Sequence, residues 1–229
     1  MALMIDIISD LVCPWCYIGK RRLERAIAAL PGGTEAEIHW HAYQLNPDMP
    51  REGIERRSYR IAKFGSWERS QQLDAQVTAA AQAEGLPFDL EKAARTPNTF
   101  DGHRVVWLAG ESDSQNAVVE ALFRAYFIDG RDIGDADTLI EIATAAGLDR
   151  GRVAALLSSD EGVTEVRAEE ENARQIGVQG VPMFVINGRV AISGAHEPAT
   201  FLQAFQQAGV PLAAAGDACI IGPDGQAEC

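Results

Sequence analysis

The chain has 229 residues, of which 47% are hydrophobic and 7% aromatic, which is enough for one large domain or for a smaller domain with a long insertion. Its 20 Lys and Arg against 33 Asp and Glu give a net charge of −13. Such an acidic chain, with no basic stripe, is repelled by phosphate backbones, so we expect no nucleic-acid partner. No apolar run approaches the ~20 residues that span a bilayer, and the first residues lack the features of a signal peptide. We therefore expect a cytoplasmic protein with no membrane partner.

A Cys-x-x-Cys pair lies at the first junction between predicted elements. Residues 4–8 form an apolar run typical of a short buried strand, and apolar residues near helical spacing predict a helix over 15–30. Cys13 and Cys16 lie between these elements, in the sequence Cys-Pro-Trp-Cys. Two cysteines three positions apart at a strand-to-helix junction indicate a thiol–disulfide redox centre.

The position of the pair predicts different roles for the two cysteines. Cys13 would lie at the helix N-terminus, where backbone N–H groups lack intrahelical partners and the helix dipole favours an anion, so Cys13 is the expected nucleophilic thiolate. Cys16 lies one turn later, is better shielded and is expected to resolve the mixed disulfide. Pro14 and Trp15 are expected to tune the thiolate and hence the redox poise.

Two other uses of the cysteine pair are less favoured. Structural zinc usually has four Cys or His ligands, and the other two cysteines, Cys219 and Cys229, do not form a second Cys-x-x-Cys. His39 and His41 could complete a zinc site, but they lie on an expected strand with alternating side chains. A purely structural cysteine pair is disfavoured in a reducing compartment. We therefore expect redox chemistry and no bound metal.

Strand signals lie near the two ends of the chain. A second strand is expected over residues 37–43. Near the other end, a strand over 181–186 is followed by Asn187-Gly188, the strongest short hairpin signal, and by a partner strand over 190–193. A final helix is expected over 197–208 because its apolar residues gather on one side.

Between these ends, almost the whole chain is predicted to be helical, with helices over 67–84, 100–109, 116–127, 150–157 and 162–176 and one more that ends at Gly147. The predicted fold class is therefore α/β, with a discontinuous domain interrupted by a large all-helical insertion. The insertion could offer a face for a homodimer. The predicted units are residues 1–47 and 177–210 for the discontinuous domain, 48–176 for the insertion and 211–229 for a C-terminal tail.

The second chemical signal is Pro182, which opens the predicted strand over 181–186. Proline is the residue at which a cis peptide bond is readily adopted, and a proline at a strand start removes a donor from the hydrogen-bond ladder. A cis bond here would place the backbone of Val181 against the reactive sulfur, where it could pair with a substrate. An ordinary trans proline would be the simpler interpretation without the cysteine pair; with the pair present, we predict cis.

Four separated motifs in the same order resemble those of DsbA-type thioredoxin-fold oxidoreductases, and most closely the cytoplasmic FrnE-like branch. The resemblance spans about residues 4 to 208. It implies a thioredoxin-like fold with a helical insertion, and a dithiol–disulfide oxidoreductase or isomerase acting on protein or small-molecule thiols and disulfides. It further implies that no cofactor is required, although glutathione could serve as a redox partner, and that Cys13, Cys16 and cis-Pro182 form the catalytic centre. The motifs lie at residues 9–19, 44–47 together with 98–104, 177–184 and 192–195.

Kappa-class glutathione transferases and 2-hydroxychromene-2-carboxylate isomerases share this architecture and supply the alternative function, a glutathione-dependent isomerase or transferase. A Ser typically replaces the first cysteine in those proteins, whereas this chain keeps both thiols, which disfavours the alternative. Their Asn-Thr…His motif is similar to Asn98, Thr99 and His103. Asn98 and His103 could form a substrate-facing wall; equally, Asn98 and Thr99 could cap a helix and His103 could pack within it.

The C-terminal tail contains the remaining cysteines, Cys219 and Cys229, on either side of a Gly-Pro-Asp-Gly turn signal. Three interpretations remain open: a second redox pair that relays electrons to or from the first, a stabilising disulfide, and incidental thiols. Extra C-terminal cysteines in some FrnE-like proteins favour the first interpretation slightly.

Overall fold

The computed structural model describes residues 3–32, 34–212, 220–221 and 227–228. Cys219 and Cys229, and with them the three interpretations of the tail, lie outside the described residues. At the end of the chain, β7 (Ile220–Ile221) and β8 (Ala227–Glu228) pair antiparallel. No helix in the described ranges is both long and apolar enough to cross a membrane.

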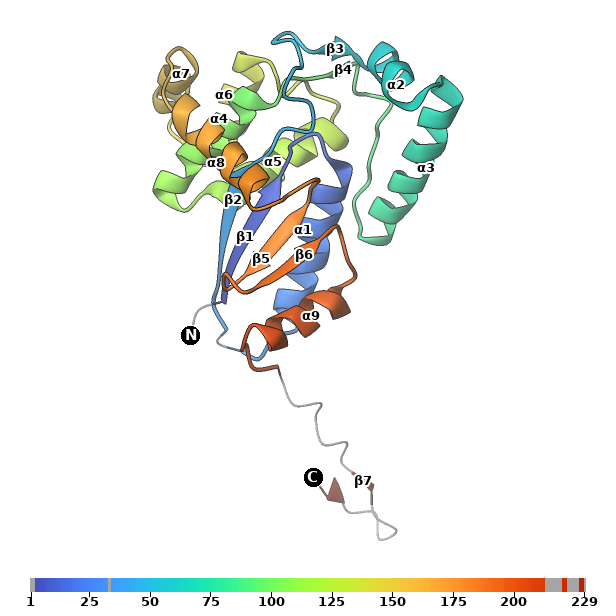
Figure 1. Ribbon diagram of the computed structural model, residues 1–229, viewed down its shortest axis with the longest axis vertical. Helices are drawn as coiled ribbons and strands as arrows, with labels where there is room; N and C mark the ends of the chain where they lie inside the picture. Colours follow the sequence, from blue (N-terminus) through green and yellow to red (C-terminus); the bar gives the residue numbers. More distant parts are fainter. Residues whose placement is uncertain (1–2, 33, 213–219, 222–226, 229) are drawn as a thin grey trace.

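A four-stranded sheet in the order β2-β1-β5-β6 forms the centre of the molecule (Figure 1). β1 (Leu3–Ser9) is parallel to β2 (Ala36–Ala42), while β5 (Met183–Ile186) is antiparallel to both β1 and β6 (Val190–Ser193). All four strands were predicted, and the first and last segments of the α/β domain meet in one sheet. The mixed sheet confirms the predicted thioredoxin-like α/β fold.

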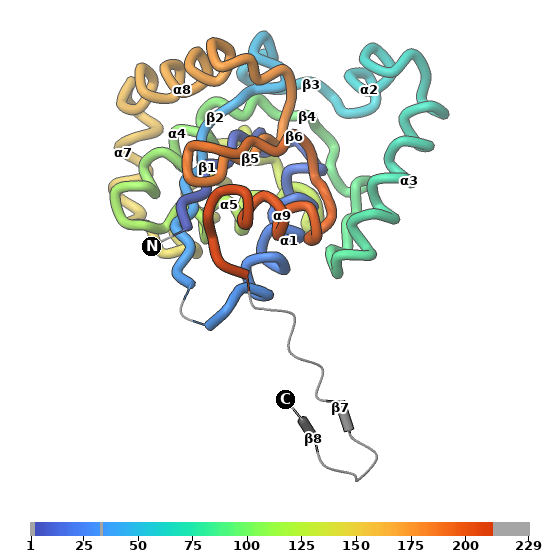
Figure 2. The backbone as a smooth tube through the Cα atoms, turned by 60° about the horizontal axis from the view of Figure 1, so that its bottom comes forward, coloured from blue at the N-terminus to red at the C-terminus, as the bar shows by residue number. Residues whose placement is uncertain are grey.

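Two helices cover one face of the sheet. Ile7 lies opposite Phe184 on that face, and both are buried against α1 (Pro14–Ala28) and α9 (Pro198–Gln207), which also contact each other (Figure 2). The ring of Phe184 meets that of Phe201 edge to face at 4.9 Å between centroids. Alternation along the strands explains this core, because every second side chain points to the same face.

The chain between β2 and β5 forms two groups of helices, of which α2 and α3 lie to the right of the sheet in Figures 1 and 2, while α4, α7 and α8 lie to its left. One group is the pair α2 (Arg56–Phe64) and α3 (Trp67–Ala83), which project from the main body. The other contains α4 (Phe100–Ala109), α5 (Gln115–Phe127), α6 (Ala136–Ala145), α7 (Arg150–Leu157) and α8 (Val163–Gln175), with a 3-10 turn over Gly110–Ser112.

The insertion differs from the prediction in two elements. β3 (Ile54–Glu55) and β4 (Arg95–Thr96) pair antiparallel, so this part of the chain is not all helical. α2 was not located from the sequence, because its N-cap is Glu55, which accepts hydrogen bonds from two backbone N–H groups of the first turn but is not among the residues that usually mark a helix start. The other helices agree with the predicted ranges within about two residues.

Ion pairs fix α1 to the insertion on two sides. Lys20 is buried and lies 2.7 Å from Glu120 of α5, which also accepts a hydrogen bond from the Tyr17 hydroxyl at 2.7 Å. On the other side of α1, Arg22 and Arg25 both pair with the carboxylate of Glu84, at 2.7 and 2.6 Å. The helix that begins beside Cys13 is therefore held from both groups of helices.

Candidate active site

Cys13 is the N-cap residue of α1, and Pro14 occupies the first turn. The first turn contains no acidic residue, so no carboxylate of the helix itself opposes the positive end of the helix dipole at Cys13. Cys13 and Cys16 are both free thiols. Cys13 is only 4% exposed, while Trp15 beside it is 40% exposed. The local geometry is therefore the one predicted from the sequence, and the nucleophilic role of Cys13 stays a prediction.

The Val181–Pro182 peptide bond is cis, as predicted. It brings Val181 next to the cysteine pair, and the Cys13 thiol donates to the Val181 carbonyl oxygen at 3.5 Å across 168 positions of sequence. The carbonyl of Pro182 accepts from the Gly194 N–H at 2.8 Å, which ties the turn to the following loop. A Cβ on Gly19 would lie 3.2 Å from the Pro182 ring, so a residue without a side chain lets α1 approach this turn closely.

Cys16 lies deeper than Cys13 and is 1% exposed. Burial, followed by the neighbouring Cys13, raises the pKa of the Cys16 thiol well above its usual value. The Ser9 hydroxyl and the Asp10 backbone act in the opposite direction and favour the thiolate, but their effect is smaller. Cys16 is therefore shielded from solvent, as expected for a resolving cysteine, and its thiol holds its proton tightly.

A cavity of about 500 Å³ opens beside Cys13 and extends between α1 and the α2–α3 pair. Its walls are mostly apolar and aromatic, and Pro14, Trp15 and Val181 line it together with Cys13. The other apolar lining residues are Val12, Leu45, Phe64, Leu73, Val77, Leu90, Ala93, Tyr126 and Phe127. Pro14, Trp15 and Val181, three of the residues predicted to tune or orient the reaction, therefore line one cavity together with Cys13.

Three cations and one acid line this cavity. Asp74 pairs with Arg56 at 2.6 Å and also with Arg60, so that two arginines share one carboxylate. Lys63 has no carboxylate partner in the described part of the chain; its ammonium donates to the Tyr59 hydroxyl at 2.6 Å and to Asn46 at 3.1 Å. The lining side chains therefore carry a net charge of about +2 if each is ionised at neutral pH, in a protein of charge −13.

Sequence reasoning missed these cations because they belong to α2, which was not located. A usable signal was present: Arg56, Arg60 and Lys63 follow each other at intervals of four and three residues, the spacing that places side chains on one face of a helix. Their proximity to Cys13 depends on the fold and could not be inferred from that spacing.

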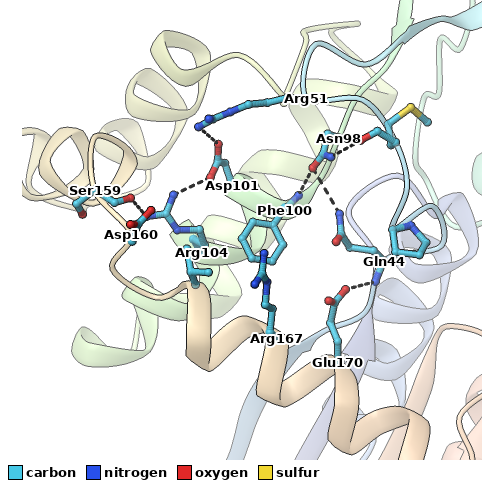
Figure 3. A pocket seen from close by; sticks show the side chains of 13 residues that line it. Gln44, Arg51, Asn98, Phe100, Asp101, Arg104, Ser159, Asp160, Arg167 and Glu170 are labelled. Atoms are coloured by element: carbon cyan, nitrogen blue, oxygen red, sulfur yellow. Dashed lines mark hydrogen bonds and ion pairs between the residues drawn. The ribbon is translucent and has the colours of Figure 1, made fainter.

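Asn98 lines a different cavity, of about 570 Å³, shown in Figure 3. Its side chain accepts from the Phe100 N–H at 2.9 Å and donates to the Met49 carbonyl at 2.6 Å. Thr99 is the N-cap residue of α4, with no side-chain cap hydrogen bond. Neither residue lines the cavity beside Cys13, so a role of Asn98 in a substrate-facing wall stays a prediction. Asn98 organises the loop that enters α4.

His103 does not line that cavity either, and its contact with a substrate stays a prediction. It is buried on α4, with Nε2 3.4 Å from Oδ1 of the buried Asp10. Asp10 is joined to the active-site loop, because its carbonyl accepts from the Cys13 N–H at 3.0 Å. His39 and His41, considered as metal ligands from the sequence, lie on β2, where His41 contacts Asp6 at 2.9 Å.

These features define a class: a thioredoxin-fold protein whose cysteine pair, at a helix N-terminus, contacts a cis-proline turn at the edge of an apolar cavity. Sequence comparison gives the family within that class. The chain belongs to the DsbA-like thioredoxin domain family, whose profile matches residues 4–206. The family predicted from the sequence motifs is confirmed, and it comprises redox and isomerase enzymes that act on thiols or disulfides.

Individual relatives agree with this assignment. A probable DsbA oxidoreductase from Streptomyces coelicolor is 36% identical, with a TM-score of 0.83 and 99% of both chains covered. The uncharacterized protein YwbO of Bacillus subtilis is 24% identical over 213 residues, 90% of this chain and 96% of that protein. The fold is shared with 2-hydroxychromene-2-carboxylate isomerase, at 20% identity, a TM-score of 0.65 and coverage of 91% and 99%. It is also shared with the cytosolic disulfide reductase DsbM from Pseudomonas aeruginosa solved with GSH, at 17% identity, a TM-score of 0.60 and coverage of 90% and 95%.

Proposed function

We propose that the protein is a dithiol–disulfide oxidoreductase that exchanges disulfides through Cys13 and Cys16. The observation that carries the proposal is the contact of the Cys13 thiol with the Val181 carbonyl, 3.5 Å away, at the edge of a cavity of about 500 Å³. The nucleophile, the backbone that can orient a partner and the space for that partner therefore lie together. The proposed roles are nucleophile for Cys13, resolving thiol for Cys16 and substrate orientation for Val181 and Pro182.

The exchange takes two displacements at sulfur. The Cys13 thiolate attacks one sulfur of a substrate disulfide, and the other sulfur leaves as a thiolate. The Cys16 thiolate then attacks Cys13 Sγ, the mixed disulfide breaks, and the second substrate sulfur leaves as a thiolate. The substrate gains two electrons, and Cys13 and Cys16 become a disulfide. The same steps in reverse oxidise a substrate dithiol, so no cofactor beyond the two thiols is required.

The charge of the cavity favours anionic thiols and disulfides of low molecular weight. Lys63 offers an ammonium without a carboxylate partner in the described residues, and Arg56 and Arg60 share Asp74. Apolar walls can cover the rest of such a ligand. Glutathione, an anionic thiol bound by a protein of the same fold, meets these requirements as a redox partner. Protein disulfides remain accessible to Cys13 through the exposed rim formed by Trp15 and Leu45.

The decisive experiment is a redox titration in glutathione buffers, with alkylation and mass spectrometry that report each cysteine separately. A Cys13–Cys16 disulfide that forms and breaks reversibly is expected. Cys13→Ser should abolish turnover, while Cys16→Ser should trap mixed disulfides on Cys13. Turnover that survives in Cys13→Ser would contradict the mechanism, and the same titration shows whether Cys219 and Cys229 exchange with the first pair.

The alternative, a glutathione-dependent isomerase or transferase, is supported by the fold shared with 2-hydroxychromene-2-carboxylate isomerase and by the cationic cavity beside the cysteine pair. It predicts a different result in the same titration. The Cys13–Cys16 pair would stay reduced throughout, while the protein kept glutathione bound without net thiol oxidation.

A further inference from the structure

A groove of about 730 Å³ lies between α3 and residues 88–94, and its volume exceeds that of the cavity beside Cys13. We call it the α3 groove. Trp67 and Ala79 contribute to its wall from α3, and Phe88 and Leu90 contribute from the facing segment. Cys13 does not line it. The α3 groove is therefore additional binding space outside the site described above.

The α3 groove adjoins the cavity beside Cys13 through a shared wall. Arg56, Asp74, Leu90 and Ala93 line both spaces. A cavity of about 500 Å³ already accommodates a small ligand, so the α3 groove serves a ligand that extends beyond it. The two spaces form one continuous path that begins at the proposed nucleophile.

Arg56 is the buried polar side chain at the junction of the two spaces. Its side chain is 10% exposed, and Nη2 is the one guanidinium nitrogen with a hydrogen-bond partner among the described residues, Asp74 at 2.6 Å. A guanidinium carries several N–H donors, and buried donors in native proteins are nearly always paired with protein groups, water or a ligand. The remaining donors of Arg56 are therefore available to carbonyl oxygens of a chain that passes between the two spaces.

The charge changes sign along this path. The side chains around the cavity beside Cys13 carry about +2, whereas the four acids and two arginines of the α3 groove carry about −2 if each is ionised at neutral pH. Asp89 pairs with Lys92 at 3.1 Å, and Glu55 caps α2. Glu91 has no ion-pair or hydrogen-bond partner in the part of the chain that the structure describes. Its carboxylate therefore favours a cationic group of the ligand.

We propose that the α3 groove binds an extended segment of a polypeptide substrate whose cysteine reacts with Cys13, and that Glu91 selects a basic side chain in that segment. The inference rests on the proposed function, because it names a class of substrate for that reaction. Arg56 holds main-chain carbonyls at the junction, and the apolar walls of the groove cover the rest of the segment. The groove contributes binding alone, so the bonds that form and break are those of the proposed function.

Cross-linking tests where the substrate lies. A peptide with one cysteine, activated as its thionitrobenzoate disulfide, is trapped on Cys13 of Cys16→Ser as a mixed disulfide. The peptide carries a benzophenone side chain about eight residues from its cysteine, a reach of roughly 26 Å when extended. Cross-links to α3 and to residues 88–94 are expected. Cross-links confined to other parts of the protein would overturn the inference.

A blocked groove provides the second test. Ala79→Trp places a large ring in the α3 groove, whereas Ala83→Trp makes the same change one turn later, at an exposed position that lines neither space. The substrates are hydroxyethyl disulfide and a long peptide whose cysteine is disulfide-bonded to mercaptoethanol. The second-order rate constant of the reduced protein with the peptide should fall about tenfold in Ala79→Trp, as when an anchoring contact is lost, and stay unchanged in Ala83→Trp. Hydroxyethyl disulfide should react with both variants at the wild-type rate, which also shows that they are folded.

A change of charge provides the third test and keeps the inference falsifiable if Ala79→Trp does not fold. The wild type should react about fivefold faster with a peptide flanked by lysines than with one flanked by glutamates, as expected for one unpaired charge. Glu91→Gln should remove most of this preference, while Glu37→Gln, which removes an exposed acid from β2, should keep it. An unchanged preference in Glu91→Gln, or an equal loss for the peptide and hydroxyethyl disulfide in Ala79→Trp, would overturn the inference and leave the proposed function intact. A wild-type protein that reacts with no disulfide would instead overturn the proposed function.

Discussion

The cavity beside Cys13 and the cavity of Figure 3 have similar volumes, about 500 and 570 Å³, but their side chains are used differently. The first is mostly apolar, and its ammonium group, Lys63, has no carboxylate partner in the described residues. The second is lined by three arginines and three acids. Arg104 of this cavity is buried, and its guanidinium N–H groups donate hydrogen bonds to other groups of the protein. Volume therefore does not distinguish the two cavities. They differ in that Lys63 of the first has no carboxylate partner among the described residues, whereas Arg104 of the second is paired with Asp101.

The contacts of Arg104 show that the residues of the second cavity hold neighbouring helices together. Its guanidinium donates to the carbonyls of Leu156, Ser159 and Glu161 at 2.6 to 2.8 Å and pairs with Asp101 at 2.7 Å. These contacts join α4 to the turn between α7 and α8. A ligand in this cavity would have to compete with bonds that already hold the helices together.

The largest effect is expected from Arg104→Met. The variant should lose at least about 3 kcal/mol of the free energy of unfolding, because several buried carbonyls and a carboxylate lose their donor. Urea unfolding measures the loss, and disulfide exchange by the folded fraction should remain. Arg51→Met is the matched control, since Arg51 lines the same cavity but is 83% exposed; it should change stability by less than about 0.5 kcal/mol. A large loss of exchange activity per folded molecule in Arg104→Met would contradict the contrast between the cavities.

A smaller effect, on function and not on stability, is expected from Lys63→Met. Under the proposed function, the value of kcat/KM for an anionic disulfide such as oxidised glutathione should fall about fivefold, equivalent to about 1 kcal/mol for one charge near the surface. A neutral disulfide such as hydroxyethyl disulfide should react at the wild-type rate. Arg51→Met removes the same charge from the other cavity and should change neither value. An equal loss for both disulfides in Lys63→Met would show that Lys63 does not select by charge.

The placement of Cys13, Cys16 and Pro182 in the fold could be predicted from the sequence because each has a strong local signal. Cys13 and Cys16 lie at a strand-to-helix junction, and Pro182 opens a strand where a ladder donor is lost. The hairpin after β5 had an equally local signal, and Asn187 and Gly188 indeed adopt φ values of 50° and 62°. Each of these features is decided within a few neighbouring residues.

The surroundings of the reacting atoms could not be predicted, because they depend on contacts between distant segments. Lys63 reaches the cavity only because α2 packs beside it. The strands β3 and β4 have two residues each and are too short to show strand alternation. His103 meets Asp10 from another element, with no periodicity that links them. For Asn98 the sequence shows a motif but not the surroundings. Its side chain forms hydrogen bonds with the backbone of Met49 and Phe100 and does not line the cavity beside Cys13.

The smallest expected effect concerns α8, whose Glu170 and Arg167 line the second cavity. Glu169 of this helix accepts from the Ala42 N–H at 2.8 Å and lies 3.8 Å from His41, so α8 is tied to β2. The hydrogen bond to Asp6, followed by the nearby carboxylate of Glu169, raises the pKa of His41 to about 9. The same contact with His41 lowers the pKa of Asp6.

These shifts predict how the attachment of α8 depends on pH. Because the pKa of His41 is higher in the folded protein than the unfolded value of about 6.5, its contribution is complete below about pH 6.5 and is lost as the pH rises through about 9. Asp6 acts in the opposite sense: its contribution is lost as the pH falls below its ordinary range. Since His41 is 35% exposed, the alkaline loss should be about 1 kcal/mol or less. Urea unfolding of the wild type and of His41→Gln should therefore differ most between about pH 5 and 6.5, where both charges are present, and converge in alkali. A difference in the free energy of unfolding that stays constant across this range would show that His41 stabilises the protein by packing and that its charge does not hold α8.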